Sequence, residues 1–589
     1  MLTLLACLVL SLPSDSTHAR DPFYELPDLE ELLQGGMRDV VSRYGVDLAN
    51  VRRFFDAEHS PQRREQERAL VQAWDAGLQA LDFDALGQDD RIDYLLLRNR
   101  LGYEARRHRI DDEKWEATRA LVPFAAAIHE LQTARRLLQP IDPREAAATL
   151  VALADELEEL RGRVALEGEE PESESDEAET LFVSRVVANR AASIAGDLED
   201  TLEGWHRYYS GYDPSFSWWV SKPYEEFRDA LKSYATFLRE DVVGVDEDDS
   251  DTIIGDPIGS EALTAELLRE MIPYSPEELV AIAYRELEWC HEEMLRASRE
   301  LGFGDDWKAA LEHIKTLHVE PGRQPQLIEE LAWEAIEYLE ANDLLTIPAL
   351  AKNGWRMEMM SPERQKFTPF FTGGEVISVS YPTDTMAHED KLMSMRGNNE
   401  HFSRAVVHHE LIPGHHMQQF MNRRYRPYRR EFRTPFWGEG WALYWELLLW
   451  ERGFQRSAED RVGMLFWRSH RCARIIFSLS FHLGTMTPQE CIDFLVDRVG
   501  HEEANASAEV RRSVQGGYGP LYQCAYMLGG LQFFALHEEL VGGGAMTDRE
   551  FHDAVLRENS IPVEMVRAKL TGQALTADFG TRWRFYEDR

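Results

Sequence analysis

The chain has 589 residues, 44% of them apolar, and carries 64 Lys and Arg against 104 Asp and Glu, a net charge of −40. A chain of this length can bury a large core, so neither disulfides nor metals are needed merely to fold it. Its negative charge repels phosphate backbones and excludes nucleic acid as an expected partner. After the first dozen residues no apolar run approaches the roughly 20 residues of a membrane-spanning helix, so we expect no transmembrane segment in the mature chain.

The chain begins with an apolar stretch, residues 2–12 (LTLLACLVLSL), followed by polar residues that end at Ala19. This pattern resembles a signal peptide cleaved after Ala19, although no Lys or Arg precedes the apolar run. We therefore expect residues 1–19 to be a signal peptide and the protein to be exported (periplasmic or secreted), with a cytoplasmic location as the alternative. Cys7 lies at the front of the apolar run, which argues against a lipoprotein site. We expect the remaining four cysteines to be buried, inert thiols.

Helical periodicity dominates the rest of the chain. Apolar residues recur at spacings of three and four over 27–44, 146–164, 182–209 and 275–301, and the sequence predicts a mainly α, two-lobed fold. Acidic stretches at 167–179 and 241–256 are expected to be solvated loops. The second separates an N-terminal helical lobe (20–250) from a C-terminal helical region (251–589). Residues 373–382 combine paired glycines with β-branched residues and predict a short β-hairpin or an edge strand beside a deep cleft.

Histidines concentrate in one segment. Five of the 19 histidines fall within residues 401–416, and one of them begins the sequence HELIPGHH at His409. This sequence resembles H-E-x-x-H, in which two histidines one helical turn apart bind Zn²⁺ and the Glu lies beside the metal-bound water. The five other His-Glu dipeptides of the chain lack further histidines nearby, and we interpret them as helix-surface pairs.

The second histidine comes too late for an unbroken helix. A residue six positions after His409 lies about 240° around the helix, and one seven positions after it lies about 10.5 Å along the axis. Pro413 and Gly414 can distort the helix, because proline removes a backbone donor and glycine accepts unusual dihedral angles. A two-residue bulge there would bring His415 to where a ligand one turn after His409 would lie. We therefore expect His409 and His415 to bind one zinc ion, with His416 or His408 as alternatives.

A third ligand is expected on an aromatic-rich helix that begins near residue 436. A carboxylate buried there is costly unless it is paired or binds a cation. Glu439, 24 residues after His415, would complete a His₂Glu site with one open position. Glu446 lies seven residues further on and could orient a ligating histidine or be the ligand itself.

These two motifs, HHELIPGHHMQ and WGEGWALYWE, resemble a family long labelled a domain of unknown function, whose members carry H-E-x-x-P-G-H-H and E-G-W-A. The pair is also similar to the motifs of gluzincin metallopeptidases, including angiotensin-converting enzyme and thimet oligopeptidase. The resemblance implies a zinc metallopeptidase that acts on short peptides or amides. It also covers a segment from residue 517 to 529, and the place of Tyr526 in it suggests an oxyanion stabiliser, with Tyr518 and Tyr522 as alternatives.

The expected chemistry is hydrolysis by metal-activated water, with Glu410 as general base. Arg511 or Arg512 is a candidate for holding a substrate carboxylate, with a surface role as the alternative. Two other functions compete with hydrolysis. One is a catalytically inactive zinc-scaffold binding protein, and the other is a di-metal helical bundle built on Glu203-x-x-His206 and Glu288-x-x-His291. The sequence predicts neither the oligomeric state nor whether the enzyme would be an exopeptidase or an endopeptidase.

Overall fold

The computed structural model describes residues 23–167, 180–246, 252–367, 371–515 and 517–586. The chain is mainly α-helical, as the sequence predicts, and its described residues form two pairs of short strands. The expected signal peptide at 1–19, residues 168–179 of the first acidic stretch and residues 247–251 of the second lie outside the described residues. Within the described ranges, no helix is both long and apolar enough to cross a bilayer.

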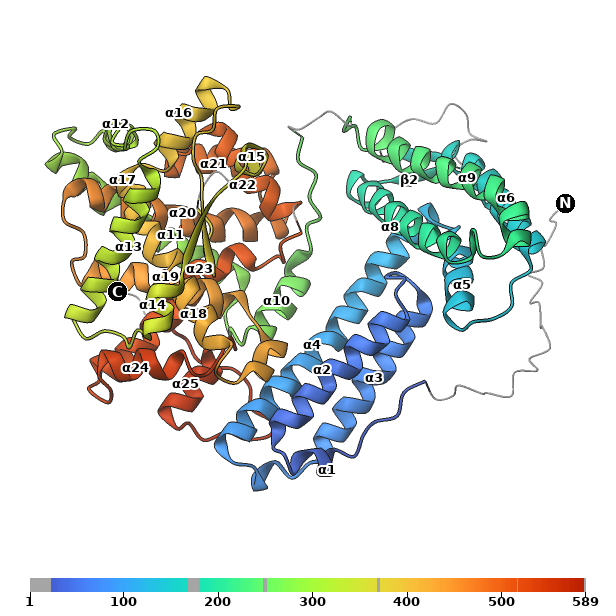
Figure 1. The fold of residues 1–589 in the computed structure, drawn as a ribbon, viewed down its shortest axis with the longest axis horizontal. Coiled ribbons are helices and arrows are strands. Elements are labelled where there is room, and N and C mark those ends of the chain that lie inside the picture. The colour runs from blue at the N-terminus through green and yellow to red at the C-terminus, as the bar shows by residue number, and fades with distance from the viewer. Residues whose placement is uncertain (1–22, 168–179, 247–251, 368–370, 516, 587–589) are drawn as a thin grey trace.

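Two hydrophobic cores organise the molecule, and Figure 1 shows the corresponding two groups of helices. The larger core joins buried residues from 29–101 to those from 253–585. The smaller core contains buried residues from 121–243. Helix α4 (Gln88–Thr118) connects them, because its first half packs in the larger core and its Trp115 packs against the smaller one.

The helices and strands fall into three consecutive groups. The first contains α1 (Leu29–Leu33), α2 (Met37–Phe54), α3 (Pro61–Ala80) and α4. The smaller core is formed by α5 (Ala125–Arg136), α6 (Pro143–Arg161), β1 (Val164–Leu166), β2 (Leu181–Val183), α8 (Arg185–Tyr209) and α9 (Pro214–Phe237). The C-terminal group contains α10 (Gly259–Arg269), α11 (Pro276–Glu300), α12 (Trp307–Lys315), α13 (Gln324–Ala341), α14 (Ala349–Gly354), β3 (Arg356–Met359), α15 (Pro362–Phe367), β4 (Val376–Val379), α16 (His388–Gly397), α17 (Glu400–Glu410), α18 (His415–Asn422), α19 (Pro435–Glu451), α20 (Ala458–His482), α21 (Pro488–Val499), α22 (Glu503–Val514), α23 (Tyr522–His537), α24 (Asp548–Val555) and α25 (Val563–Thr571).

The two cores divide the chain differently from the boundary expected at residue 250. Residues 29–101, which the sequence analysis grouped with the N-terminal lobe, share their core with the C-terminal region. The helix expected over 27–44 is two helices, because the chain turns at Gly36, whose φ of 86° is readily adopted only by glycine. Helix α11 begins as predicted, with Ser275 and Glu278 forming a reciprocal capping box.

The strand expected in 373–382 is present as β4, but it is not part of a hairpin. Its partner is β3, which precedes it and runs parallel to it with Arg356 opposite Val376. A parallel pair needs a crossover connection, and helix α15 lies within that connection. Thr372, which precedes β4, exchanges backbone hydrogen bonds with Ser378 of β4 in a single antiparallel bridge.

Helices α19 and α23 approach each other closely where they are both glycine-rich. A Cβ atom added to Gly440 would lie 2.5 Å from the Cα atom of Gly529, and one added to Gly529 would lie 2.1 Å from the carbonyl oxygen of Phe436. Side chains at these positions would therefore force the helices apart. The close packing brings Glu439 of α19 beside Tyr522 of α23.

Candidate metal centre

The histidine segment is interrupted where the sequence predicts it. Helix α17 ends at Glu410 and α18 starts at His415, so the chain forms two helices rather than one helix with a bulge. The amide of Gly414 donates a hydrogen bond to the carbonyl of His408 at 3.0 Å. A Cβ atom at Gly414 would lie only 1.7 Å from the carbonyl oxygen of His409, so this turn requires glycine. The turn brings the rings of His409 and His415 to a centroid distance of 4.9 Å.

Glu439 faces both imidazoles. Its Oε2 atom lies 3.1 Å from Nε2 of His415 and 3.6 Å from Nε2 of His409. Two donors that bind one zinc ion tetrahedrally at about 2.0–2.2 Å lie about 3.3–3.6 Å apart, so these separations suit a shared ion. Oε2 of Glu439 is also buried without a hydrogen-bond partner. A buried carboxylate oxygen of this kind fits a cation ligand, and the donor set therefore fits Zn²⁺.

The outer nitrogens of both imidazoles are held by neighbouring side chains. Nδ1 of His409 lies 2.6 Å from Oε1 of Glu446. Nδ1 of His415 lies 2.8 Å from the side-chain amide of Gln418, which also donates to the carbonyl of Gly438. The Glu446 carboxylate can only accept, so it fixes the orientation of the His409 ring and leaves the lone pair of that ring on Nε2. The Gln418 amide nitrogen is a donor and fixes only the position of the His415 ring. The structure thus places Glu446 at Nδ1 of His409 and Glu439 at the Nε2 atoms of both rings.

The ionisable groups at this point favour a cation between them. Burial alone would lower the pKa of His409, but its contacts with Glu439 and Glu446 outweigh burial and raise the pKa to about 9. Burial alone would raise the pKa of Glu439, but the charges of His415 and His409 hold it well below its usual range. Each shift thus reflects the mutual attraction of buried imidazole and carboxylate groups.

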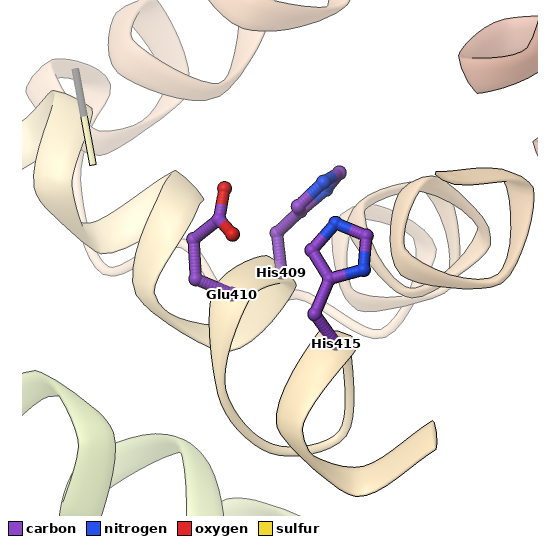
Figure 2. A group of neighbouring side chains, drawn as sticks. All are labelled: His409, Glu410 and His415. Carbon is purple, nitrogen blue, oxygen red and sulfur yellow. The ribbon is translucent and has the colours of Figure 1, made fainter. Parts of the chain in front are cut away.

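Glu410 also lies close to the two imidazoles. One carboxylate oxygen of Glu410 and one nitrogen each of His409 and His415 lie within 4.8 Å of one another. Figure 2 shows the three side chains projecting into the same space from the junction of α17 and α18. Burial raises the pKa of Glu410, while His415 and His409 partly offset the increase. A carboxyl group with a raised pKa suits proton transfer near neutral pH.

A cavity of about 290 Å³ opens onto these groups and is lined by residues of several helices and of the segment before β4. Tyr526 lines it, with its ring 6.2 Å from that of His409. Burial raises the pKa of Tyr526, so its hydroxyl stays protonated and can donate a hydrogen bond. The Tyr522 hydroxyl donates instead to Oε1 of Glu439 at 2.6 Å, and Tyr518 is more exposed and packs on Tyr522.

The two alternative histidine ligands face other parts of the protein. Nδ1 of His408 lies 3.1 Å from the carbonyl oxygen of Arg404, and its ring packs against Phe454. Both ring nitrogens of His416 lie near backbone carbonyls, those of Gly374 and Ala351. Neither histidine belongs to the cluster of His409, Glu410 and His415 found in the described part of the chain.

The two Glu-x-x-His pairs considered for a di-metal bundle lie on helices of different cores. Glu203 is exposed on α8 and pairs with Arg207, whereas Glu288 is exposed on α11 and pairs with Arg498. Helix α8 belongs to the smaller core and α11 to the larger one, so the two pairs do not share one bundle.

The sequence analysis missed two arginines that line the cavity, Arg471 and Arg474 on α20. Both are buried in a helix whose neighbouring residues are largely apolar. Charged residues inside such a helix are a signal that sequence alone offers, because an unpaired buried charge is costly. Of the two arginines that it did consider, Arg512 lines the cavity, whereas Arg511 donates to the carbonyl of Thr252 at 3.1 Å.

One protein family matches this chain over most of its length. Residues 48–570 match the family described as "Bacterial protein of unknown function (DUF885)". The chain belongs to this family. No curated protein matches the chain.

Two solved structures share the fold of this DUF885 protein. A candidate lipoprotein of unknown function from Shewanella oneidensis has a TM-score of 0.66 and 16% identity, over 91% of this chain and 100% of that one. A candidate lipoprotein from Colwellia psychrerythraea has a TM-score of 0.56 and 14% identity, over 91% of this chain and 99% of that one. At these identities the similarity concerns the fold alone.

Proposed function

We propose that this protein is a zinc-dependent hydrolase, a metallopeptidase that cleaves short peptides. One observation carries the proposal: the unpartnered Oε2 of Glu439 lies 3.1 and 3.6 Å from Nε2 of His415 and His409, with the Glu410 carboxyl group in the same cavity. Structural zinc sites use four protein ligands, whereas catalytic sites keep one position open. Three ligands beside a spare carboxyl group favour catalysis. The similarity of both motifs to those of gluzincin metallopeptidases supports the same reaction.

His409, His415 and Glu439 would hold the ion. When bound, Zn²⁺ would act as a Lewis acid that polarises the substrate carbonyl and lowers the pKa of a water molecule. Glu446 would accept a hydrogen bond from Nδ1 of His409, so that the Nε2 lone pair of this ring is available to the ion.

Glu410 would transfer the proton. As the water oxygen forms a bond to the carbonyl carbon, the Glu410 carboxylate accepts a proton from that water. It then donates this proton to the amide nitrogen as the carbon–nitrogen bond breaks, so that the amine leaves neutral. The Tyr526 hydroxyl, protonated and on the cavity wall, would donate a hydrogen bond to the carbonyl oxygen as negative charge develops there.

Export is part of the proposal. The apolar leader-like segment of residues 2–12 supports it, and so does the description of both similar structures as candidate lipoproteins. N-terminal sequencing of the mature protein tests it, with residue 20 expected as the first residue.

The function is tested by metal analysis and peptide hydrolysis on the full chain. We expect one zinc ion per wild-type chain and cleavage of a short-peptide library. Glu410→Gln should keep that zinc and lose about 10²-fold to 10⁴-fold or more in hydrolysis, because only the proton acceptor is removed. Glu439→Ala should lose zinc, because a ligand is removed. Glu538→Gln is the matched control, since exposed Glu538 also follows a histidine but lies outside the cavity.

Each outcome distinguishes between the candidate functions. Zinc binding without hydrolysis of any peptide would support the inactive zinc scaffold instead. Full hydrolysis by Glu410→Gln would remove this residue from the reaction. Stoichiometric zinc in Glu439→Ala would assign the third ligand elsewhere, and iron rather than zinc in the wild type would contradict the choice of metal.

A further inference from the structure

Two buried arginines form part of the cavity wall beside the proposed zinc site. Arg471 and Arg474 are 5% and 3% exposed, and both line the cavity. Their guanidinium carbons each lie 4.6 Å from the ring centroid of Tyr526, whose ring in turn lies 6.2 Å from that of His409. The tyrosine therefore connects the arginines to the metal ligands.

The carboxylates of the protein only partly neutralise these arginines. Nε of Arg474 donates to Oε1 of Glu509 at 2.6 Å, but the same oxygen also accepts from Nη2 of Arg512 at 3.3 Å. The Arg471 guanidinium is 3.9 Å from Oε1 of Glu446, which already contacts Nδ1 of His409. Glu509 thus pairs with two guanidinium groups, and Glu446, the carboxylate beside Arg471, already contacts His409.

Two nitrogen atoms of these arginines also lack a hydrogen-bond acceptor in the protein. Nη1 of Arg474 and Nε of Arg471 are buried and have no hydrogen-bond partner. The imidazoles of His470 and His501 beside them bring no negative charge, and burial lowers the pKa of His501 to about 4. The stacking of both arginines on Tyr526 offsets only part of the cost of burying each cation. An additional anion would offset the difference.

We propose that Arg471 and Arg474 form a subsite for a carboxylate of the substrate, either the C-terminal α-carboxylate of a short peptide or an acidic side chain. The proposal rests on the proposed hydrolysis and names its substrate class. Guanidinium groups present planar sets of donors that match a carboxylate. The protein as a whole has a charge of −40, so attraction of an anionic substrate requires such a local cluster.

The test compares matched peptides with the zinc-loaded enzyme. One peptide has a free C-terminal carboxylate and no acidic side chain, a second is its C-terminal amide, and a third is the amide with one Glu introduced. For the wild type we expect kcat/KM to be at least tenfold higher for the first or third peptide than for the second. The preferred peptide identifies the source of the carboxylate. Equal values for all three peptides would overturn the proposal.

The variants Arg471→Gln and Arg474→Gln assign the effect to these residues. Each should lower kcat/KM about 10-fold to 100-fold for the preferred carboxylate peptide and much less for the amide. Arg471→Lys and Arg474→Lys keep the charge, so they test the guanidinium geometry if a glutamine variant fails to fold. Arg430→Gln, on the surface, is the charge-matched control. If folded, zinc-loaded variants lost hydrolysis of the carboxylate peptide and of the amide peptide in equal proportion, the result would contradict a carboxylate subsite.

Binding separates this proposal from the proposed function. Isothermal titration of zinc-loaded Glu410→Gln with the same peptides requires no hydrolysis. Tighter binding of the carboxylate peptide, lost on adding Arg474→Gln, would support the subsite even if the wild type hydrolysed nothing. Hydrolysis without any preference for a carboxylate would retain the peptidase and remove the subsite.

Discussion

Substitution of Gly414 by alanine tests whether the turn between α17 and α18 sets the metal site. The new Cβ atom would lie 1.7 Å from the carbonyl oxygen of His409 and 2.4 Å from its carbonyl carbon. Both contacts are to backbone, so rotation of a side chain cannot relieve them. The segment that leads into His415 must move away from His409.

The size of this movement follows from contact distances. A carbon and a carbonyl oxygen approach no closer than about 3.3–3.6 Å, so the two segments must separate by about 1.7 Å. Zinc ligands tolerate deviations of only about 0.2 Å. Removal of a side chain that only hydrogen-bonds to a metal ligand already lowers metal affinity about 10-fold to 100-fold. We therefore expect Gly414→Ala to lower zinc affinity at least 100-fold and to lose about 1–3 kcal/mol of stability to overpacking.

Zinc affinity is measured by competition with a chelator, and stability by urea unfolding of the metal-free protein. Gly204→Ala is the matched control, because Gly204 is in α8 and a Cβ atom there would meet no atom within 4 Å. That variant should keep its zinc affinity and gain about 0.5–1 kcal/mol of helix stability. If folded Gly414→Ala bound zinc within threefold of the wild type, the turn would not determine the ligand positions.

The remaining predictions concern the surroundings of the ligands and the dependence on pH. Glu446→Gln should weaken zinc binding about 10-fold to 100-fold in chelator competition, because Nδ1 of His409 loses its carboxylate partner; unchanged affinity would assign Glu446 a packing role. Tyr526→Phe should keep zinc and lower kcat about 10²-fold to 10³-fold, and an unchanged kcat would place the oxyanion elsewhere. The free energy of unfolding should decrease as pH falls from about 6.5 to about 4, by up to about 1.4 kcal/mol per pH unit for each buried neutral histidine, because the unfolded chain takes up protons that the folded chain excludes. Burial lowers the pKa of these histidines to about 4 for His129, His408, His482 and His501 and to about 3 for His552. Urea unfolding across this range measures the effect, and a flat profile would contradict it.

Much of the local structure was predictable because it depends on neighbours in the chain. The helical class follows from the spacing of apolar residues, and the start of α11 follows from the capping pattern at Ser275. The break before His415 follows from the steric demands of Pro413 and Gly414. The choice of His415 over His416 depended on how far the break shifts the second helix. The structure brings His415 to Glu439 and turns His416 toward Gly374 and Ala351.

Other features required contacts between distant segments. The sequence analysis placed 20–250 in one lobe, yet residues 29–101 pack with the C-terminal region because their apolar faces meet helices more than 150 residues away. The partner of β4 was likewise not predictable, since pairing with β3 in parallel depends on the crossover through α15.

Sequence patterns were sufficient to predict a helical protein with a cluster of imidazoles, an adjacent Glu410 and two candidate carboxylates on one helix. They favoured Glu439 as the ligand but left Glu446 as an alternative, because the two share a face of α19 two turns apart. Only the tertiary structure decided between them: the packing of α19 against α17 directs Glu439 to Nε2 of His409 and Glu446 to Nδ1. Likewise, only the packing of α20 beside α23 brought Arg471 and Arg474 to the cavity, because the position of one helix against another depends on contacts that no single segment encodes.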